Sequence, residues 1–176
     1  LPCSRAVITC FKFCNMEYQY PKRKTPRITG FDYSSVQAYF VTTVAAGRER
    51  IFSCINDRGQ IELLPTGKIV QQHIEALPTH YECVQVQKYV IMPDHIHIII
   101  FIGQSDEQKR PSMNQIMAAF KAGVSREIGR PIWQRSYYDH IIRSQSDYDE
   151  VWQYIENNPM QWVIDGKSIA RKPQGK

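Results

Sequence analysis

Long apolar stretches are missing from this sequence. No run of apolar residues reaches the roughly 18 that a membrane-spanning helix requires. The first residues, 1–14, are mildly apolar, but Arg5 and Lys12 interrupt them, so they lack the continuous core of a signal peptide. We therefore expect a cytoplasmic protein with no membrane partner.

Cysteine is sparse and irregularly spaced. The chain has five cysteines, an odd number, and no two of them form a Cys-x-x-Cys pair. This pattern supports neither a disulfide framework nor a zinc knuckle. Free thiols in a reducing cytoplasm account for all five cysteines.

Several common motifs of phosphate chemistry and hydrolysis are also absent. There is no glycine-rich loop ending in Lys-Ser or Lys-Thr, and no Gly-x-Ser-x-Gly elbow. A histidine-triad hydrolase needs a third alternating histidine after His95 and His97, but position 99 is Ile. The paired His-x-Thr or His-x-Ser motifs of two-histidine phosphoesterases do not occur either.

The positive charge is concentrated at the two ends of the chain. The chain has 176 residues, enough for one domain with a real core, and a net charge of +5. Residues 1–30 carry six Lys or Arg and one Glu, and residues 166–176 carry four and no acid. We expect a basic, largely irregular arm over 1–30, a single domain over 31–165 and a basic tail over 166–176. Such ends favour a polyanion partner, although tails that only aid solubility fit the charge equally well.

Periodicity and turn residues predict both strands and helices. The expected strands are 38–44, 51–55 paired with it, 83–91 and 95–102, with a strand or extended segment at 133–142. The expected helices are 66–76, 112–128 capped by Ser112, and 147–157 capped by Ser146 and ended by Pro159. Strands joined by hairpins and helices in this order indicate an α+β fold, an antiparallel sheet with helices packed on it.

Two histidines interrupt the most apolar strand. Side chains alternate between the faces of a strand, so His95 and His97 point the same way. An imidazole in an apolar layer is costly unless its nitrogens are bonded. A shared divalent metal is the simplest partner for two neighbouring imidazoles, and it explains them better than two separately bonded core or surface histidines. For His140, by contrast, we expect a structural hydrogen bond.

The predicted last helix carries a candidate third ligand. Tyr154 and Asn158 are four residues apart and therefore share a helix face. The Asn158 side chain offers an oxygen that suits Mg²⁺ or Mn²⁺. Taken alone, however, Asn158 also fits a helix C-cap before Pro159, and Tyr154 fits a tyrosine at the edge of the core, which is far commoner than a nucleophile.

Four segments resemble the signatures of one known family, in that family's order. They are Phe31-Asp-Tyr-Ser34 with Ala38-Tyr-Phe-Val-Thr42, Val90-Ile-Met-Pro-Asp-His-Ile-His97, Trp133-Gln-Arg-Ser-Tyr-Tyr-Asp-His-Ile-Ile-Arg143 and Trp152-Gln-Tyr-Ile-Glu-Asn-Asn-Pro159. In combination they resemble the REP-associated tyrosine transposases, bacterial members of the HUH-type single-strand transposases with one active-site tyrosine. The resemblance covers roughly residues 22–162. Asp94 and Ser53 depart from it, since the family usually has Asn and Gly there.

The resemblance implies a fold, an activity and a metal site. The fold is the HUH-endonuclease, ferredoxin-like architecture, with residues 31–165 as the catalytic domain. His95, His97 and Asn158 bind Mg²⁺ or Mn²⁺, and Tyr154 attacks a phosphodiester to give a 5′-phosphotyrosine link that is later rejoined. The substrates are single-stranded DNA hairpins of repetitive palindromic elements, which implies a nucleoid-associated enzyme acting as a monomer or homodimer.

The resemblance and the charge pattern together suggest DNA contacts. The expected DNA-binding residues are Lys22, Arg23, Lys24, Arg27, Lys121, Arg126, Arg135 and Arg143. Two other functions stay open at this point. One is a domesticated DNA-hairpin-binding protein with little catalysis, and the other is a nicking enzyme of the replication-initiator or relaxase type.

Overall fold

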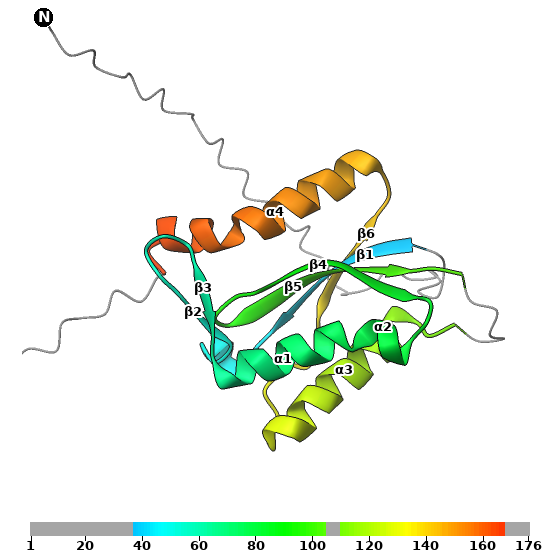
Figure 1. The fold of residues 1–176 in the computed structure, drawn as a ribbon, viewed down its shortest axis with the longest axis horizontal. Coiled ribbons are helices and arrows are strands. Elements are labelled where there is room, and N and C mark those ends of the chain that lie inside the picture. Colours follow the sequence, from blue (N-terminus) through cyan, green and yellow to red (C-terminus); the bar gives the residue numbers. More distant parts are fainter. Residues whose placement is uncertain (1–36, 105–109, 168–176) are drawn as a thin grey trace, which may run out of the picture.

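A computed structural model describes residues 37–104 and 110–167. Within these ranges the largest sheet has four antiparallel strands in the order β4-β5-β1-β6 (Figure 1). Its strands are β1 (Gln37–Val44), β4 (Val84–Ile91), β5 (His95–Ile102) and β6 (Tyr138–Ile142). Strand β1 is therefore central, with β5 on one side and β6 on the other.

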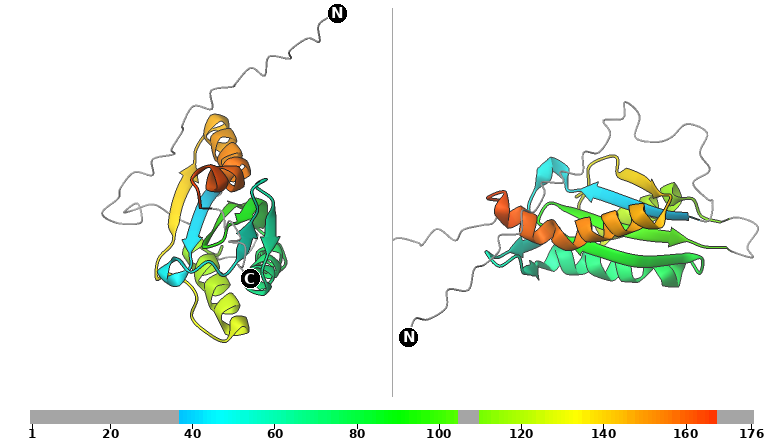
Figure 2. Two further views of the ribbon diagram at one scale, coloured as in Figure 1. Left: turned by 90° about the vertical axis from the view of Figure 1, so that its left-hand side faces the viewer. Right: turned by 90° about the horizontal axis from the view of Figure 1, so that it is seen from above.

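Helices cover both faces of this sheet (Figures 1 and 2). On one face lie α1 (Pro65–Glu75), α2 (Leu77–His80) and α3 (Met113–Ile128). The opposite face is covered by α4 (Gln145–Ile164). The predicted α+β architecture, an antiparallel sheet with helices packed on it, is therefore confirmed.

The alternation of β5 divides the core into two layers. Ile96, Ile98 and Ile100 are fully buried among the residues of α1 and α3. Ile99 faces the other way, into a second cluster with Val151 and Ile155 of α4. Odd-numbered positions of β5 therefore point toward α4, and this parity puts both strand histidines on the α4 side.

Most of the predicted elements agree with the structure. The expected strands at 38–44, 83–91 and 95–102 correspond to β1, β4 and β5, and the helices at 66–76 and 112–128 to α1 and α3. Ser112 caps α3 with a reciprocal capping box, in which Gln115 donates its backbone N–H to the Ser112 hydroxyl and returns a side-chain bond. The extended segment at 133–142 contains β6 in its second half.

The pairing expected for 51–55 is wrong. This segment contributes β2 (Ser53–Ile55), which pairs with β3 (Ile61–Leu63) in a separate two-stranded ribbon rather than with β1. Both edges of β1 are already occupied by longer partners, so β2 pairs locally with β3 through the turn at residues 56–60. There the Asn56 carboxamide oxygen accepts backbone N–H bonds from Arg58 and Gln60, each 3.0 Å long.

The predicted bounds of the last helix are also wrong at both ends. Ser144, not Ser146, is the N-cap and accepts the backbone N–H of Asp147 at 3.2 Å. Pro159 lies inside α4, which runs on to Ile164. A proline costs the helix one hydrogen bond and a steric contact with the preceding turn. Burial of Trp162 beyond it offsets that cost, because the indole is only 7 % exposed in the second core cluster.

The helices of the described residues do not include a candidate membrane span. The predicted arm over residues 1–30 and most of the predicted tail over 166–176 lie outside the described residues.

Candidate active site

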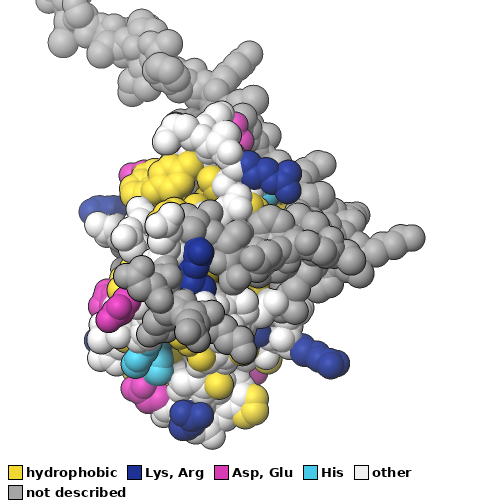
Figure 3. Space-filling model, turned by 90° about the vertical axis from the view of Figure 1, so that its right-hand side faces the viewer, with side chains coloured by type: hydrophobic (Ala, Val, Ile, Leu, Met, Phe, Trp, Pro, Cys, Tyr) yellow, Lys and Arg dark blue, Asp and Glu magenta, His cyan; other side chains and the backbone are white. Residues whose placement is uncertain are grey.

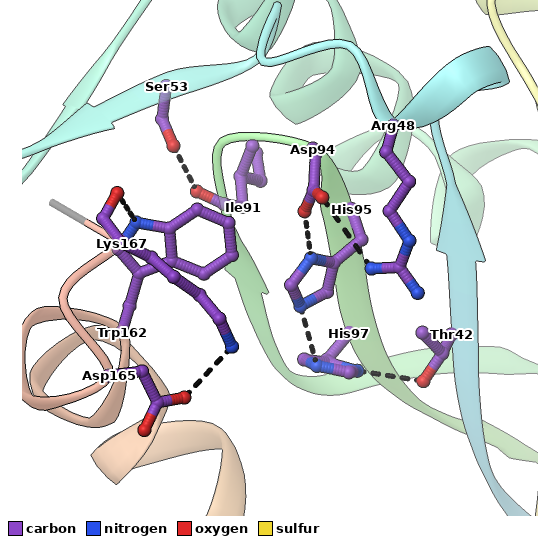
Figure 4. A network of polar contacts seen from close by, with 10 residues as sticks. All are labelled: Thr42, Arg48, Ser53, Ile91, Asp94, His95, His97, Trp162, Asp165 and Lys167. Atoms are coloured by element: carbon purple, nitrogen blue, oxygen red, sulfur yellow. Dashed lines mark hydrogen bonds and ion pairs between the residues drawn. The ribbon is translucent and has the colours of Figure 1, made fainter. Parts of the chain in front are cut away.

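The two strand histidines meet edge to face on the α4 side of the sheet. Their ring centroids are 4.7 Å apart at an interplanar angle of 76°. The Nε2 atoms of His95 and His97 lie 3.1 Å from each other (Figure 4). His97 is only 2 % exposed, so the pair forms the floor of a sheltered site.

Each histidine is held through its other nitrogen. Nδ1 of His95 lies 2.5 Å from a carboxylate oxygen of Asp94, the residue before it. Nδ1 of His97 lies 2.7 Å from the hydroxyl oxygen of Thr42, its cross-strand partner on β1. Such contacts fix the orientation of each ring and leave Nε2 as the atom offered to a ligand.

Local electrostatics favour a neutral imidazole at the deeper position. Burial, together with the charge of neighbouring His95, holds the pKa of His97 well below its usual range. Burial opposes ionisation of Asp94, but the hydrogen bond from His95 and the charges of His95 and Arg48 outweigh it, so the pKa of Asp94 is lowered. A neutral imidazole is the form in which histidine binds metals, so the lowered pKa of His97 suits it to that role.

The residues present fit a divalent metal. Two nitrogens that each lie about 2.1 Å from one ion are themselves about 3 Å apart, which matches the His95–His97 separation. Among the described residues, no three His, Cys, Asp or Glu side chains form a group that could hold a metal ion. A third protein ligand must therefore be a residue of another type, and α4 offers Asn158.

The phenol ring of Tyr154 packs edge to face against His97. Its ring centroid is 5.2 Å from that of His97 and 5.9 Å from that of Phe40 on β1. Phe40 in turn stacks on His97 at 5.3 Å. The tyrosine and both histidines belong to one chain, so a single chain brings them together.

Asn158 lies between two contacts that α4 makes with the pair. Tyr154 precedes it by one turn and touches His97, while Trp162 follows by one turn and lies 5.9 Å from His95. Because residues four apart share a helix face, half-buried Asn158 lies on the same face of α4 as Tyr154 and Trp162, the face that contacts the histidines. The C-cap of α4 is Asp165, so the C-cap explanation of Asn158 is wrong.

Thr42 and Trp162 also contact the two histidines, but the sequence pattern did not predict them as part of the site. Thr42 is a polar residue in an apolar strand, and its position opposite His97 depends on the β1–β5 register. Trp162 continues the spacing of Tyr154 and Asn158, but the expectation that Pro159 ends the helix removed it from consideration. His140 behaves as expected, since its Nε2 lies 2.8 Å from an Asp147 carboxylate oxygen at the start of α4.

The chain is similar in sequence to a small number of known proteins. No protein-family model matches the chain. An uncharacterised protein of Haemophilus influenzae is 31 % identical over 165 residues, covering 81 % of this chain and 91 % of that protein. The REP-associated tyrosine transposase of Escherichia coli is 27 % identical over 81 residues, 45 % of this chain and 47 % of that protein. The chain thus spans about half of that named transposase.

A solved structure extends the likeness to the whole fold. The structure of a REP-associated tyrosine transposase bound to a REP hairpin superposes with a TM-score of 0.60 at 19 % identity, over 82 % of this chain and 86 % of that one. The chain thus shares its fold with a REP-associated tyrosine transposase and is similar in sequence to such transposases over part of its length. The predicted HUH-type architecture is therefore confirmed, with α4 as the helix that carries the tyrosine.

The predicted DNA-binding residues within the described part of the chain lie on different elements. Lys22, Arg23, Lys24 and Arg27 lie outside the described residues. Lys121 and Arg126 are on α3, across the sheet from the histidine pair. Arg135 and Arg143 are exposed at opposite ends of the segment that contains β6.

Lys121 has a structural role that accounts for its position. Its ammonium group donates to three consecutive backbone carbonyls, of Gln134 at 2.5 Å and of Arg135 and Ser136 at 3.3 Å each. Burial lowers the pKa of Lys121. These bonds hold the segment that leads into β6, so Lys121 is a weaker candidate for phosphate contact than the exposed arginines.

Arg143 lies at the end of the sheet farthest from the histidine pair. It borders a shallow groove with Gln37, Gln85, Gln145 and Tyr148 among its other lining residues. Figure 3 shows this end of the molecule, where the coloured Lys and Arg side chains stand apart from one another among polar and apolar groups. The visible part of this face therefore offers single cations rather than one continuous basic patch.

Proposed function

We propose that this chain is a metal-dependent tyrosine transposase that binds hairpin-forming single-stranded DNA, cleaves it and rejoins it. The observation that carries the proposal is the contact of the Tyr154 ring with His97, 5.2 Å between centroids, above two convergent imidazole nitrogens. A tyrosine and two histidines from distant parts of the sequence are thus close together, which supports the roles of nucleophile and metal ligands that we propose for them. DNA as the substrate implies action at the bacterial nucleoid.

The metal-binding part of the proposal assigns three ligands. His95 and His97 would hold Mg²⁺ or Mn²⁺ through Nε2, and Asn158 through its carboxamide oxygen. A bound ion of this kind polarises the scissile phosphate and neutralises the charge that develops on it. Asp94 and Thr42 keep the two rings oriented, because each contacts the Nδ1 atom opposite the ligating nitrogen.

The cleavage step centres on the phenol of Tyr154. Its oxygen attacks phosphorus and loses its proton to water, and a new bond forms between phosphorus and the tyrosine oxygen. The bond from phosphorus to the 3′ oxygen breaks, and that oxygen leaves as a 3′-hydroxyl after taking up a proton. The product is a 5′-phosphotyrosine link, and attack on it by a 3′-hydroxyl restores the phosphodiester without ATP.

Asp94 is better suited to positioning than to proton transfer. One of its carboxylate oxygens contacts His95 Nδ1, and the other lies 3.5 Å from the Arg48 guanidinium. Both oxygens are therefore engaged on the side of His95 that faces away from the ligating nitrogen. Water is left as the acceptor of the phenol proton in this proposal.

The proposed substrate follows from the likeness to a solved structure and from the predicted basic residues. The solved relative is bound to a REP hairpin. We propose that the corresponding DNA contacts here come from Lys22, Arg23, Lys24 and Arg27 and from exposed Arg126, Arg135 and Arg143, with Lys121 supporting the fold beside them. These positive groups would contact the DNA backbone rather than read bases.

A covalent-adduct assay tests the proposed function. The full chain with Mn²⁺ and a single-stranded DNA hairpin labelled on the 3′ side of the cut should give a labelled band that survives denaturation. Tyr154→Phe should abolish the band, because it removes only the attacking oxygen. Tyr148→Phe is the matched control: it lies on the same helix but packs against Trp152, with centroids 5.8 Å apart, and should retain the band.

Two other outcomes separate the alternative functions. Tight hairpin binding by the unaltered chain without any adduct would identify a hairpin-binding protein that lacks catalysis. An adduct that forms equally well on single strands without a hairpin would instead indicate a nicking enzyme of the relaxase type.

A further inference from the structure

Three basic side chains that the predicted DNA contacts do not include border the histidine pair. Arg48 and Arg50 come from the connection between β1 and β2, where Ala46–Arg48 form a short 3-10 turn. Lys167 follows the end of α4. Figure 4 shows Arg48 and Lys167 on opposite sides of His95. The two segments are far apart in sequence, so the fold alone brings these cations to one edge of the site.

Arg48 is held beside the site by an unusual backbone conformation. It has a φ of 55°, and among the described residues it is the one non-glycine residue with a positive φ. Gly47 precedes it at 61°. Strained positions of this kind persist where the surrounding structure enforces them and gather at functional sites. The conformation directs the Arg48 guanidinium toward Asp94, the residue that holds His95.

The Arg48 side chain is available to a ligand. It is 64 % exposed, and its ion pair with Asp94 is long, at 3.5 Å between Nη1 and the carboxylate oxygen. A guanidinium has five N–H donors, so this one contact leaves most of them facing solvent. Planar, forked donors of this kind bind phosphate oxygens in pairs.

Arg50 and Lys167 place two further cations on the other side of His95. The Arg50 guanidinium and the Lys167 ammonium lie 5.4 Å and 5.7 Å from the centroid of the Trp162 ring, which itself lies 5.9 Å from His95. Arg50 also donates to the backbone carbonyl of Lys167 at 3.0 Å. That bond uses a neutral acceptor and so does not offset the charge of Arg50, whereas the Lys167 ammonium is paired with Asp165 at 2.9 Å.

The local charge balance differs from that of the rest of the domain. Near the histidines, Asp94 and Asp165 face Arg48 and Lys167, while Arg50 has no acidic partner among the described residues. The surrounding segment 31–165, in contrast, has twelve Lys or Arg against sixteen Asp or Glu. A polyanion therefore meets a net positive edge at this place on an otherwise slightly acidic body.

We propose that Arg48, Arg50 and Lys167 form a phosphate-binding rim that holds the DNA backbone on both sides of the bond attacked by Tyr154. The proposal rests on the proposed function and adds the residues that grip the substrate. Arg48 contacts the backbone on the Asp94 side of His95, and Arg50 and Lys167 contact it on the Trp162 side. The ligand class is a single-stranded phosphodiester backbone, without regard to base sequence.

The experiment measures DNA binding without cleavage. The full chain carrying Tyr154→Phe is titrated, in EDTA and at several salt concentrations, with a synthetic DNA hairpin that has single-stranded flanks. Arg48→Ala, Arg50→Ala and Lys167→Ala should each weaken binding about tenfold at low salt. Each should also make the negative slope of log K against log salt shallower by about 0.7. Lys68→Ala is the matched control, since it removes one exposed charge from α1 on the opposite face and should change neither quantity.

Two further comparisons distinguish loss of a phosphate contact from a change in the local structure. Arg50→Gln keeps an amide donor for the Lys167 carbonyl but loses the charge, so a rim predicts the same loss of salt slope as for Arg50→Ala. A blunt hairpin without flanks should bind the three variants and the parent equally well. Equal losses on the blunt hairpin, or slopes that match that of Lys68→Ala, would overturn the rim.

Failure of the rim and failure of the proposed function give different results. Catalysis is read from the adduct of the chain with Tyr154 intact, while the rim is read from binding by the Tyr154→Phe chain. An adduct with unchanged salt slopes would overturn the rim alone. Altered slopes without an adduct would overturn the catalytic proposal and support the rim.

Discussion

The smallest feature that decides chemistry in this molecule is the second nitrogen of each histidine. Asp94 contacts Nδ1 of His95 and Thr42 contacts Nδ1 of His97, and both contacts are shorter than 2.8 Å. An imidazole without such a partner can rotate and can bind protons or metals through either nitrogen. The two partners therefore define Nε2 as the nitrogen that each ring offers to a ligand.

Thr42 and its neighbour Thr43 offer a matched pair of substitutions. We expect Thr42→Val to weaken Mn²⁺ binding about tenfold, because the orienting contact to His97 is lost. Thr43 is fully buried, and its hydroxyl has no hydrogen-bond partner among the described residues. Thr43→Val also removes a threonine hydroxyl, at the neighbouring position, and should leave Mn²⁺ affinity unchanged. Calorimetry measures the Mn²⁺ affinity of both variants. Equal affinities for the two variants would show that Thr42 does not orient the ring.

Helix α4 is the element on which the candidate site depends. It places Tyr154, Asn158 and Trp162 at successive turns of one face, and the last of these lies beyond a proline. The terminal turn is held by the Trp162 indole, which donates to the Lys167 carbonyl at 2.9 Å, and by Gly166 in the left-handed conformation at a φ of 67°. Pro159 removes one internal hydrogen bond from α4, and the contacts of Trp162 and Gly166 hold the turns that follow it.

Replacing the proline tests whether it only weakens the helix. Pro159→Ala restores an N–H that can bond to the carbonyl of Ile155, so the free energy of unfolding should rise by up to about 3 kcal/mol. Asn157→Ala, an exposed change in the same helix, should raise it by less than about 1 kcal/mol. Urea unfolding followed by circular dichroism measures both. A fall in stability for Pro159→Ala would mean that α4 requires the bend that a proline produces.

The sequence predicted the sheet better than the ends of its elements. The shared face of His95 and His97 follows from strand alternation alone, and the Ser112 cap follows from local chemistry, so both could be foreseen. The pairing of β2 and the passage of α4 through Pro159 depend on contacts with distant residues. Trp162 is the clearest example, because its burial against the sheet outweighs the local tendency of Pro159 to end the helix.

At the scale of the whole molecule, the excess positive charge lies at the ends of the chain and not in the folded domain. The described domain spans a segment with more acidic than basic residues, while the ends of the chain are strongly basic. Attraction of DNA therefore has to come from the ends and from local features such as the proposed rim. The overall field of the domain does not supply it.

The basic arm can be tested by its effect on salt dependence. Replacing Lys22, Arg23 and Lys24 with Ala should weaken hairpin binding and lower the slope of log K against log salt by about 2, since each lost phosphate contact contributes about 0.7. Lys68, Arg58 and Arg110, all outside the proposed DNA contacts, replaced together with Ala give a control of equal net charge. A slope unchanged from that of the unaltered chain would show that the arm serves only solubility.

The order in which the site's parts are made has a consequence for synthesis in the cell. The histidines of β5 leave the ribosome well before α4, which carries Tyr154 and is held at its end by the bond between Trp162 and Lys167. A nascent or prematurely terminated chain would hold the imidazoles without the phenol above them. Under the proposed function, a DNA strand can be broken only after α4 has been made, and a chain that stops before α4 has no tyrosine with which to cut.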